Sequence, residues 1–141
     1  MNNRQMAWAM LRQAEAILEE ARYVYERRRW NLVVRRCQES VELALKGALL
    51  WAGAEVPRVH DVGPILRREA QRFPPEFRAH IPALASLSRA LRAERELSFY
   101  GDEQSGVPAD ELYTDLDAQA KLADAVTVLE QCRKLFLDKE P

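Results

Sequence analysis

The stretch VVRRCQESVELALKGALLW, residues 33–51, carries the clearest structural signal in the chain. Its apolar residues recur at steps of three and four, which places them on one face of an α-helix. They are Val34, Cys37, Val41, Ala44, Ala48 and Trp51. Leu45 and Leu49 widen this face, so the helix should contact more than one neighbour. We predict a helix from about residue 30 to residue 52, ended by Gly53 in the left-handed conformation that glycine adopts easily.

A second helical pattern precedes this stretch, from about residue 3 to residue 28. Its apolar residues repeat with the same spacing, and Asn2 or Asn3 can cap its first turn with a side-chain oxygen. They are Met6, Met10, Ala14, Ile17, Ala21 and Val24. The link between the two patterns is very short, so the helices should pack antiparallel as a hairpin.

The rest of the chain also favours helices. We predict a short helix capped by Asp61, a fourth helix that begins at Pro82, and a last helix over roughly residues 109–137. Residues 54–60 and 98–107 are expected to be loops. No useful length of sequence alternates with a period of two, so no sheet is expected. The prediction is an all-α, up-down bundle of four long helices plus a shorter one, forming a single domain over residues 1–141.

Composition limits the function. The chain has 141 residues, a net charge of −1 and 30% charged residues, so its overall charge gives no reason to expect strong nonspecific binding to nucleic acid. The first ten residues lack the pattern of a signal peptide, and no apolar run approaches the roughly 18 residues of a membrane helix. We expect a cytoplasmic protein without membrane contact. Cys37 and Cys132 fall inside helical patterns and are interpreted as core residues, and neither a metal nor a cofactor is expected.

A set of features in fixed order carries a family resemblance. Gln38, Ser40, Glu42 and Lys46 lie on the second helix, and Gly53, Val56-Pro57 and His60-Asp61 follow it. This order resembles the HEPN domain family (higher eukaryotes and prokaryotes nucleotide-binding), in its bacterial stand-alone type, over nearly the whole chain. The resemblance implies a helical bundle that forms homodimers. It also implies a minimal nucleotidyltransferase as partner, in a module of the toxin–antitoxin type.

The resemblance further implies metal-independent cleavage of RNA, for which the family signature is an Arg followed four to six residues later by a His. In this chain Arg95 has the spacing, but Tyr100 stands in the place of the His. The phenol of tyrosine titrates near pH 10, which makes it a poor general base at neutral pH. Arg95 and Tyr100 are therefore the candidate catalytic pair of an altered motif. His60 is interpreted as part of a helix start, packed on its loop.

Two further groups of polar residues are candidates. Gln38, Glu42 and Lys46 are spaced four apart and form a polar stripe, which is either a solvated face or a partly buried stripe that fixes helix register or faces a partner. Arginines also recur every third residue later in the chain, where they form either an RNA- or nucleotide-binding strip or an ordinary charged face. They are Arg89, Arg92 and Arg95.

The amino-acid sequence is compatible with three functions. The leading hypothesis is an interaction protein that works with a minimal nucleotidyltransferase. The alternatives are a ribonuclease that uses Arg95 and Tyr100, and a nucleotide-binding regulatory domain without catalysis.

Overall fold

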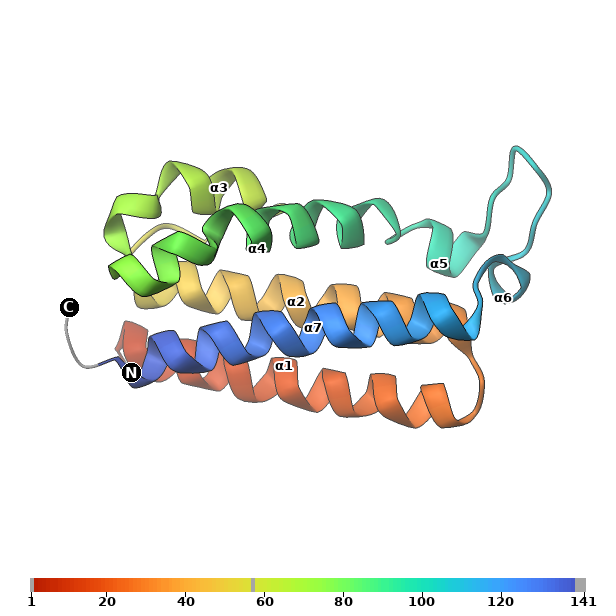
Figure 1. Cartoon of the computed structure of the whole chain (residues 1–141), viewed down its shortest axis with the longest axis horizontal. Coiled ribbons are helices and arrows are strands. Elements are labelled where there is room, and N and C mark those ends of the chain that lie inside the picture. Colours follow the sequence, from red (N-terminus) through yellow and green to blue (C-terminus); the bar gives the residue numbers. More distant parts are fainter. Residues whose placement is uncertain (1, 57, 139–141) are drawn as a thin grey trace.

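The computed structural model describes residues 2–56 and 58–138. Within them the elements are α1 (Asn3–Glu26), α2 (Trp30–Trp51), α3 (Gly63–Arg68), the 3-10 helix η1 (Ala70–Arg72), α4 (Pro75–Ala93), α5 (Leu97–Tyr100), α6 (Ala109–Leu112) and α7 (Asp115–Leu137). The long helices α1, α2, α4 and α7 lie alongside one another (Figure 1), which confirms the predicted all-α bundle. No β-strand occurs in the described ranges, where Asp102 and Val107 form one isolated bridge.

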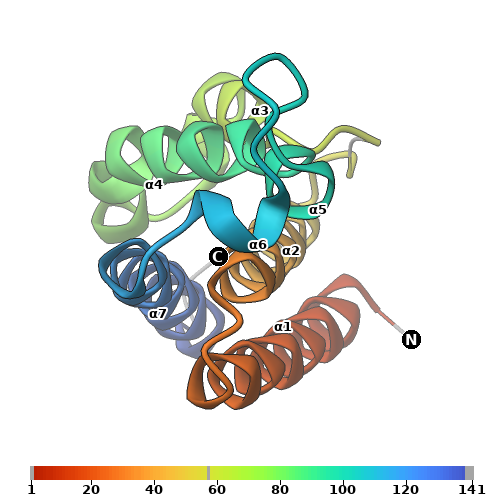
Figure 2. The same ribbon diagram turned by 90° about the vertical axis from the view of Figure 1, so that its right-hand side faces the viewer.

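Helix α2 lies at the centre of the fold. It packs against α1, α7, α4 and α5 (Figure 2), as the width of its apolar face predicted. Asn2 caps α1 by accepting a hydrogen bond from the backbone N–H of Gln5 at 2.8 Å. The approach of α1 and α2 is close, because a Cβ on Gly47 would lie 3.3 Å from the Cβ of Met10.

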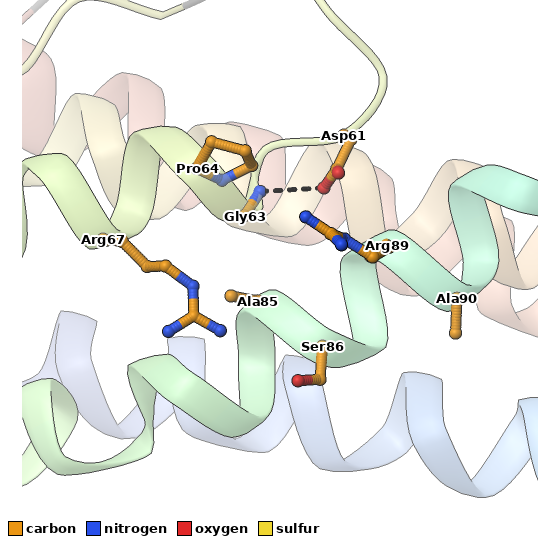
Figure 3. Close-up of a pocket in the computed structure, with 8 residues that line it drawn as sticks. All are labelled: Asp61, Gly63, Pro64, Arg67, Ala85, Ser86, Arg89 and Ala90. Carbon is orange, nitrogen blue, oxygen red and sulfur yellow. Dashed lines mark hydrogen bonds between the residues drawn. The ribbon is translucent and has the colours of Figure 1, made fainter.

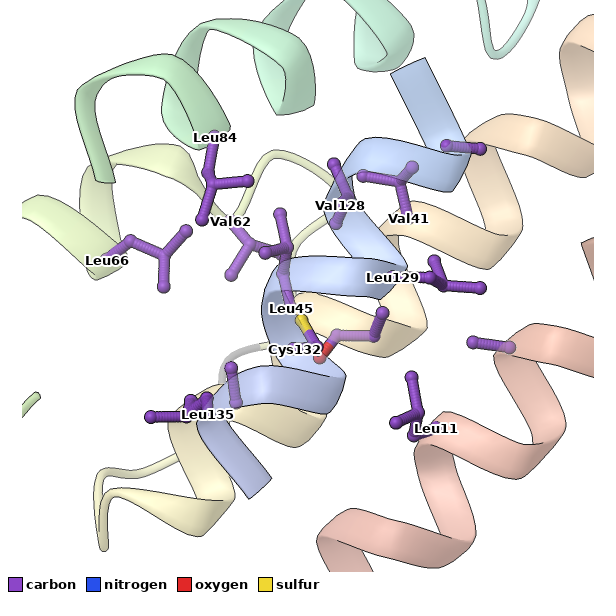
Figure 4. Packing of buried hydrophobic residues seen from close by; sticks show 14 of the residues in the cluster. Leu11, Val41, Leu45, Val62, Leu66, Leu84, Val128, Leu129, Cys132 and Leu135 are labelled. Atoms are coloured by element: carbon purple, nitrogen blue, oxygen red, sulfur yellow. Dashed lines mark hydrogen bonds between the residues drawn. The ribbon is translucent and has the colours of Figure 1, made fainter. Parts of the chain in front are cut away.

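The core joins all four long helices. Figure 4 shows leucines of α1, α2, α4 and α7 pointing into one apolar interior, with Val62 and Leu66 covering one end of it. Cys37 and Cys132 are both fully buried free thiols, which confirms their interpretation as core residues. Burial raises the pKa of each thiol to about 12, so both stay protonated at neutral pH.

The fourth helix begins earlier than predicted. Helix α4 starts at Pro75, and Pro82 lies inside it rather than at its first turn. An internal proline removes one helical hydrogen bond and costs about 3 kcal/mol. Ile81 and Leu84 are buried on either side of this position, and their packing keeps the helix continuous. Pro82 itself is exposed.

The last helix is broken where one continuous helix was predicted. Helix α6 ends at Leu112, and α7 begins at Asp115. Thr114 caps α7 by accepting from the N–H of Asp117 at 3.2 Å, while the Asp117 carboxylate accepts from the N–H of Thr114 at 2.9 Å. This reciprocal cap satisfies two backbone donors at a new helix start and so fixes the break.

The two predicted loops also differ in detail. Asp61 is not the cap residue of α3, which is Val62, although the Asp61 carboxylate accepts from the N–H of Gly63 at 3.0 Å. Residues 98–107 are not wholly irregular, because α5 occupies their beginning. Within the loop predicted at residues 54–60, Pro57 lies outside the described residues.

Candidate functional site

The carboxylate of Glu42, in the middle of α2, collects three polar side chains. It accepts hydrogen bonds from the Gln38 amide at 2.8 Å and from the Lys46 ammonium at 2.9 Å. These two contacts follow from the four-residue spacing, which places the three side chains on one helical stripe. The third neighbour is the Nδ1 of His60, also at 2.9 Å, from the loop that follows α2. The predicted polar stripe is therefore a bonded group.

Arg95, from the segment between α4 and α5, joins the same group. Its guanidinium donates to the Gln38 side-chain oxygen at 2.8 Å and lies 4.0 Å from the Glu42 carboxylate. Gln38 is only 2% exposed and is hydrogen-bonded at both ends of its amide. We call these five residues the Glu42 network: Gln38, Glu42, Lys46, His60 and Arg95.

The Glu42 network has a net positive charge. Burial acts to raise the pKa of Glu42, but hydrogen bonds from Lys46, Gln38 and His60 outweigh it and hold the pKa below its ordinary value. Glu42 is thus ionised at neutral pH. One carboxylate faces the two permanent cations Lys46 and Arg95, so the surplus is positive and favours an anionic ligand.

The orientation of His60 follows from this charge state. An ionised carboxylate can only accept hydrogen bonds. The Nδ1–H of a neutral His60 ring is therefore the donor, and the Glu42 carboxylate is the acceptor. The described residues give the Nε2 of that ring no hydrogen bond, so it is available to a ligand. The His60 side chain is 42% exposed, which gives solvent and ligands access to it.

Short helix α5 is bonded to the first half of α2. The Arg35 guanidinium donates to the backbone carbonyl of Arg95 at 2.6 Å, and the Asn31 amide donates to that of Ser98 at 3.1 Å. The Arg35 guanidinium also lies 3.9 Å from the centre of the Phe99 ring. These contacts fix α5 while leaving Tyr100 70% exposed. Figure 2 shows α5 and the segment after α2 on the same side of α2.

The structure brings together only part of what the sequence singled out. Arg95 meets the polar stripe, but within the described part of the chain the Tyr100 hydroxyl has no hydrogen bond, and the Arg95 guanidinium bonds Gln38 instead. The arginine strip divides, because Arg92 pairs with Glu96 at 2.8 Å and Arg89 lines a separate groove between α3 and α4.

Sequence reasoning missed the role of His60 in this site. It was interpreted as packing on its loop, and no spacing rule connects residues 42 and 60. The one signal was the polar pair His60-Asp61 itself, since the loop after α2 can fold back and bring such a pair onto the polar stripe of that helix. Residues 2–56 and 58–138 contain no group of three His, Cys, Asp or Glu side chains placed to hold a metal ion.

Comparison with known proteins gives the class. The HEPN domain family model matches residues 7–135, and the chain belongs to this family. Membership supports a nucleotide-binding or ribonuclease-type domain in general. No curated protein and no solved structure gives a significant match. Within the described ranges no helix has the length and apolar character to cross a membrane.

Proposed function

We propose that the protein is the HEPN half of a two-protein module of the toxin–antitoxin type, and that α5 is the surface it presents to a minimal nucleotidyltransferase. The supporting observation is the way α5 is held. Asn31 bonds the backbone of α5 and Arg35 bonds the backbone just before it, while Phe99 and Tyr100 extend into solvent, 43% and 70% exposed. Rigid, exposed aromatic side chains are typical of protein interfaces, since they bury much area at little cost in entropy.

Tyr100 also suits covalent modification by such a partner. Its hydroxyl is accessible and has no hydrogen bond in the described residues. In the reaction, the phenol oxygen forms a bond to the α-phosphorus of a nucleoside triphosphate. The bond from that phosphorus to the pyrophosphate leaving group breaks, and the phenolic proton is lost to solvent or to a base of the partner.

Co-expression with a minimal nucleotidyltransferase encoded in the neighbouring gene tests this proposal. We expect the two proteins to copurify, and the intact mass of this chain to rise by whole nucleotidyl groups. Tyr100→Phe should abolish the added mass, while Tyr23→Phe, which alters an exposed tyrosine of α1, should not. Failure to copurify together with an unchanged mass would reject the proposal.

A second function, metal-independent cleavage of RNA, is favoured by the placement of His60. The free Nε2 can take the proton of a ribose 2′-hydroxyl. The 2′-oxygen then bonds to the adjacent phosphorus, the bond to the 5′-oxygen breaks, and the leaving oxygen takes up a proton. Arg95 and Lys46 offset the charge that develops on the phosphate. His60 suits this proton transfer better than Tyr100, because His60 belongs to the same hydrogen-bonded network as Arg95 and Lys46 and Tyr100 does not.

Purified protein and labelled RNA separate the alternatives. His60→Ala should abolish cleavage, and His80→Ala should retain it because His80 is exposed on α4 away from the Glu42 network. Tyr100→Phe should also retain it, whereas the Arg95/Tyr100 alternative expects a loss. No cleavage by the wild-type chain at high concentration would reject this second function.

A further inference from the structure

A groove between α3 and α4 lies outside the Glu42 network. Its volume is about 640 Å³. Arg67 of α3 and Arg89 of α4 each reach toward the opposite helix across it, as Figure 3 shows. Ser86 and the small side chains of Ala85 and Ala90 line the α4 side. The groove thus has a cation on each wall, with no bulky side chain between them.

The two groove arginines differ from Arg72 and Arg92, for which the described residues supply a partner. Arg72 is paired with Glu69 at 2.8 Å, and Arg92 is paired with Glu96 at the same distance. For Arg67 and Arg89, the described residues supply neither a hydrogen bond nor an ion pair. Their donors are free for a ligand, and a guanidinium fits the oxygens of a phosphate with two parallel hydrogen bonds.

The groove also has a fixed floor. Gly63 packs so tightly on α4 that a Cβ there would lie 2.9 Å from the backbone oxygen of Ala85. The acidic side chain at the rim, Asp61, is already engaged, because one of its oxygens accepts from the N–H of Gly63 and from the hydroxyl of Ser88, each at 3.0 Å. Two free cations therefore face one carboxylate whose hydrogen bonds point into the protein.

We propose that this groove binds phosphate groups, with Arg67 and Arg89 as the residues that contact them. The chemistry is shared by a nucleoside triphosphate and by the backbone of single-stranded RNA, and the experiment below distinguishes these sources. The proposal needs neither Tyr100 nor His60. Phosphate binding in the groove can therefore fail while both functions proposed above stand, and it can hold while both of them fail.

Binding is measured with ATP by calorimetry and with a labelled single-stranded RNA by fluorescence anisotropy. Arg67→Ala and Arg89→Ala should each weaken binding about tenfold, because each removes a charge-assisted contact to phosphate. Arg12→Ala removes the same charge from an exposed position on α1 and should change binding less than twofold. In the RNA arm, each groove variant should also lower the slope of log affinity against log salt by about one.

A steric variant adds an independent readout. Ser86 is exposed, so Ser86→Trp should fold normally while its indole fills the groove and blocks the ligand. Circular dichroism checks that each variant retains its helices. Binding of ATP alone would assign a nucleotide, and binding of RNA alone would assign the polymer. The proposal is overturned if neither probe binds at millimolar concentration, or if Arg12→Ala weakens binding as much as the groove variants do.

Discussion

The α1–α2–α7 part of the bundle and the α2–α5 contact use the same central helix in different ways. To the apolar core that it shares with α1 and α7, α2 contributes Ala44, Leu45 and Ala48, all fully buried. Toward α5 and the loop after α2, it presents Asn31, Arg35, Gln38 and Glu42, which form hydrogen bonds. Apolar burial supplies most of the folding free energy, whereas a hydrogen bond contributes only about 1 kcal/mol net.

This difference assigns a separate task to each side of α2. The apolar side holds the fold together, and its packing does not depend on the charges at the protein surface. The polar side contributes less to stability but sets the positions of charged and aromatic groups, since hydrogen bonds depend on direction and apolar contacts do not. Variants on the apolar side should therefore cause large losses of stability. Variants on the polar side should cause smaller losses and should mainly alter the position of α5 and the response to pH.

The largest effect is expected on the apolar side. Leu45→Ala should lower the free energy of unfolding by about 3 kcal/mol, since it removes a fully buried side chain and leaves a cavity in the core. Urea denaturation measures this loss. Leu116→Ala is the control, because Leu116 is 75% exposed and its truncation should cost less than about 0.5 kcal/mol. Equal losses at the two positions would remove the distinction between the regions.

A smaller but still large effect is expected where α5 ends. Gly101 has φ of 75° and ψ of −172°, and a Cβ there would lie 2.4 Å from the backbone oxygen of Val107. Gly101→Ala should lower the free energy of unfolding by about 2 kcal/mol, because the backbone strain of the positive φ and the clash with Val107 add to each other. It should also speed hydrogen exchange in α5. Gly106 has φ of 71°, but a Cβ there would meet no atom within 4 Å. Gly106→Ala should therefore cost about 1 kcal/mol, from backbone strain alone. If Gly106→Ala proves the more damaging, the close packing at Gly101 does not hold α5.

The smallest effect concerns the pH dependence of the Glu42 network. The pKa of Glu42 is lower in the folded chain than its ordinary value of 4.5, so its ionised form stabilises the fold. This contribution is complete above the ordinary value and is lost as the pH falls through the lowered folded pKa. The stability difference between wild type and Glu42→Gln should therefore be full at pH 7 and shrink below about pH 4.5.

Urea denaturation at pH 7, 5, 4 and 3 measures this difference. Glu19→Gln serves as the matched control, because Glu19 is exposed on α1 and the described residues give it no ion pair. Its difference from wild type should stay nearly constant over the same range. A Glu42→Gln difference that grows toward acid pH would contradict the assigned sign of the pKa shift.

Local patterns predicted much of this arrangement. The apolar spacing of α1 and α2, the Asn2 cap and the buried cysteines all rest on rules that reach no further than four residues. The same rules failed where packing or a competing local signal prevailed. Pro82 indicates a helix start because the effect of proline on the backbone is local. The helix nevertheless begins at Pro75, and its buried residues Ile81 and Leu84 hold it together on either side of the proline.

The sequence did contain a signal for the break before α7, because Thr114 and Asp117 have the spacing of a capping box. The apolar pattern of the following helix concealed this signal. Of the candidate site, the sequence predicted the stripe of Gln38, Glu42 and Lys46, and it selected Arg95. It connected neither Arg95 with the stripe nor Arg89 with Arg67.

The sequence by itself determined an all-helical chain, its helical hairpin and the residue types available for phosphate chemistry, because helix periodicity and capping act between near neighbours. Only the tertiary structure decided that His60 and Arg95 converge on Glu42 and that two arginines of different helices face one groove. Such contacts join positions 18 to 57 residues apart, and their geometry depends on how whole helices pack.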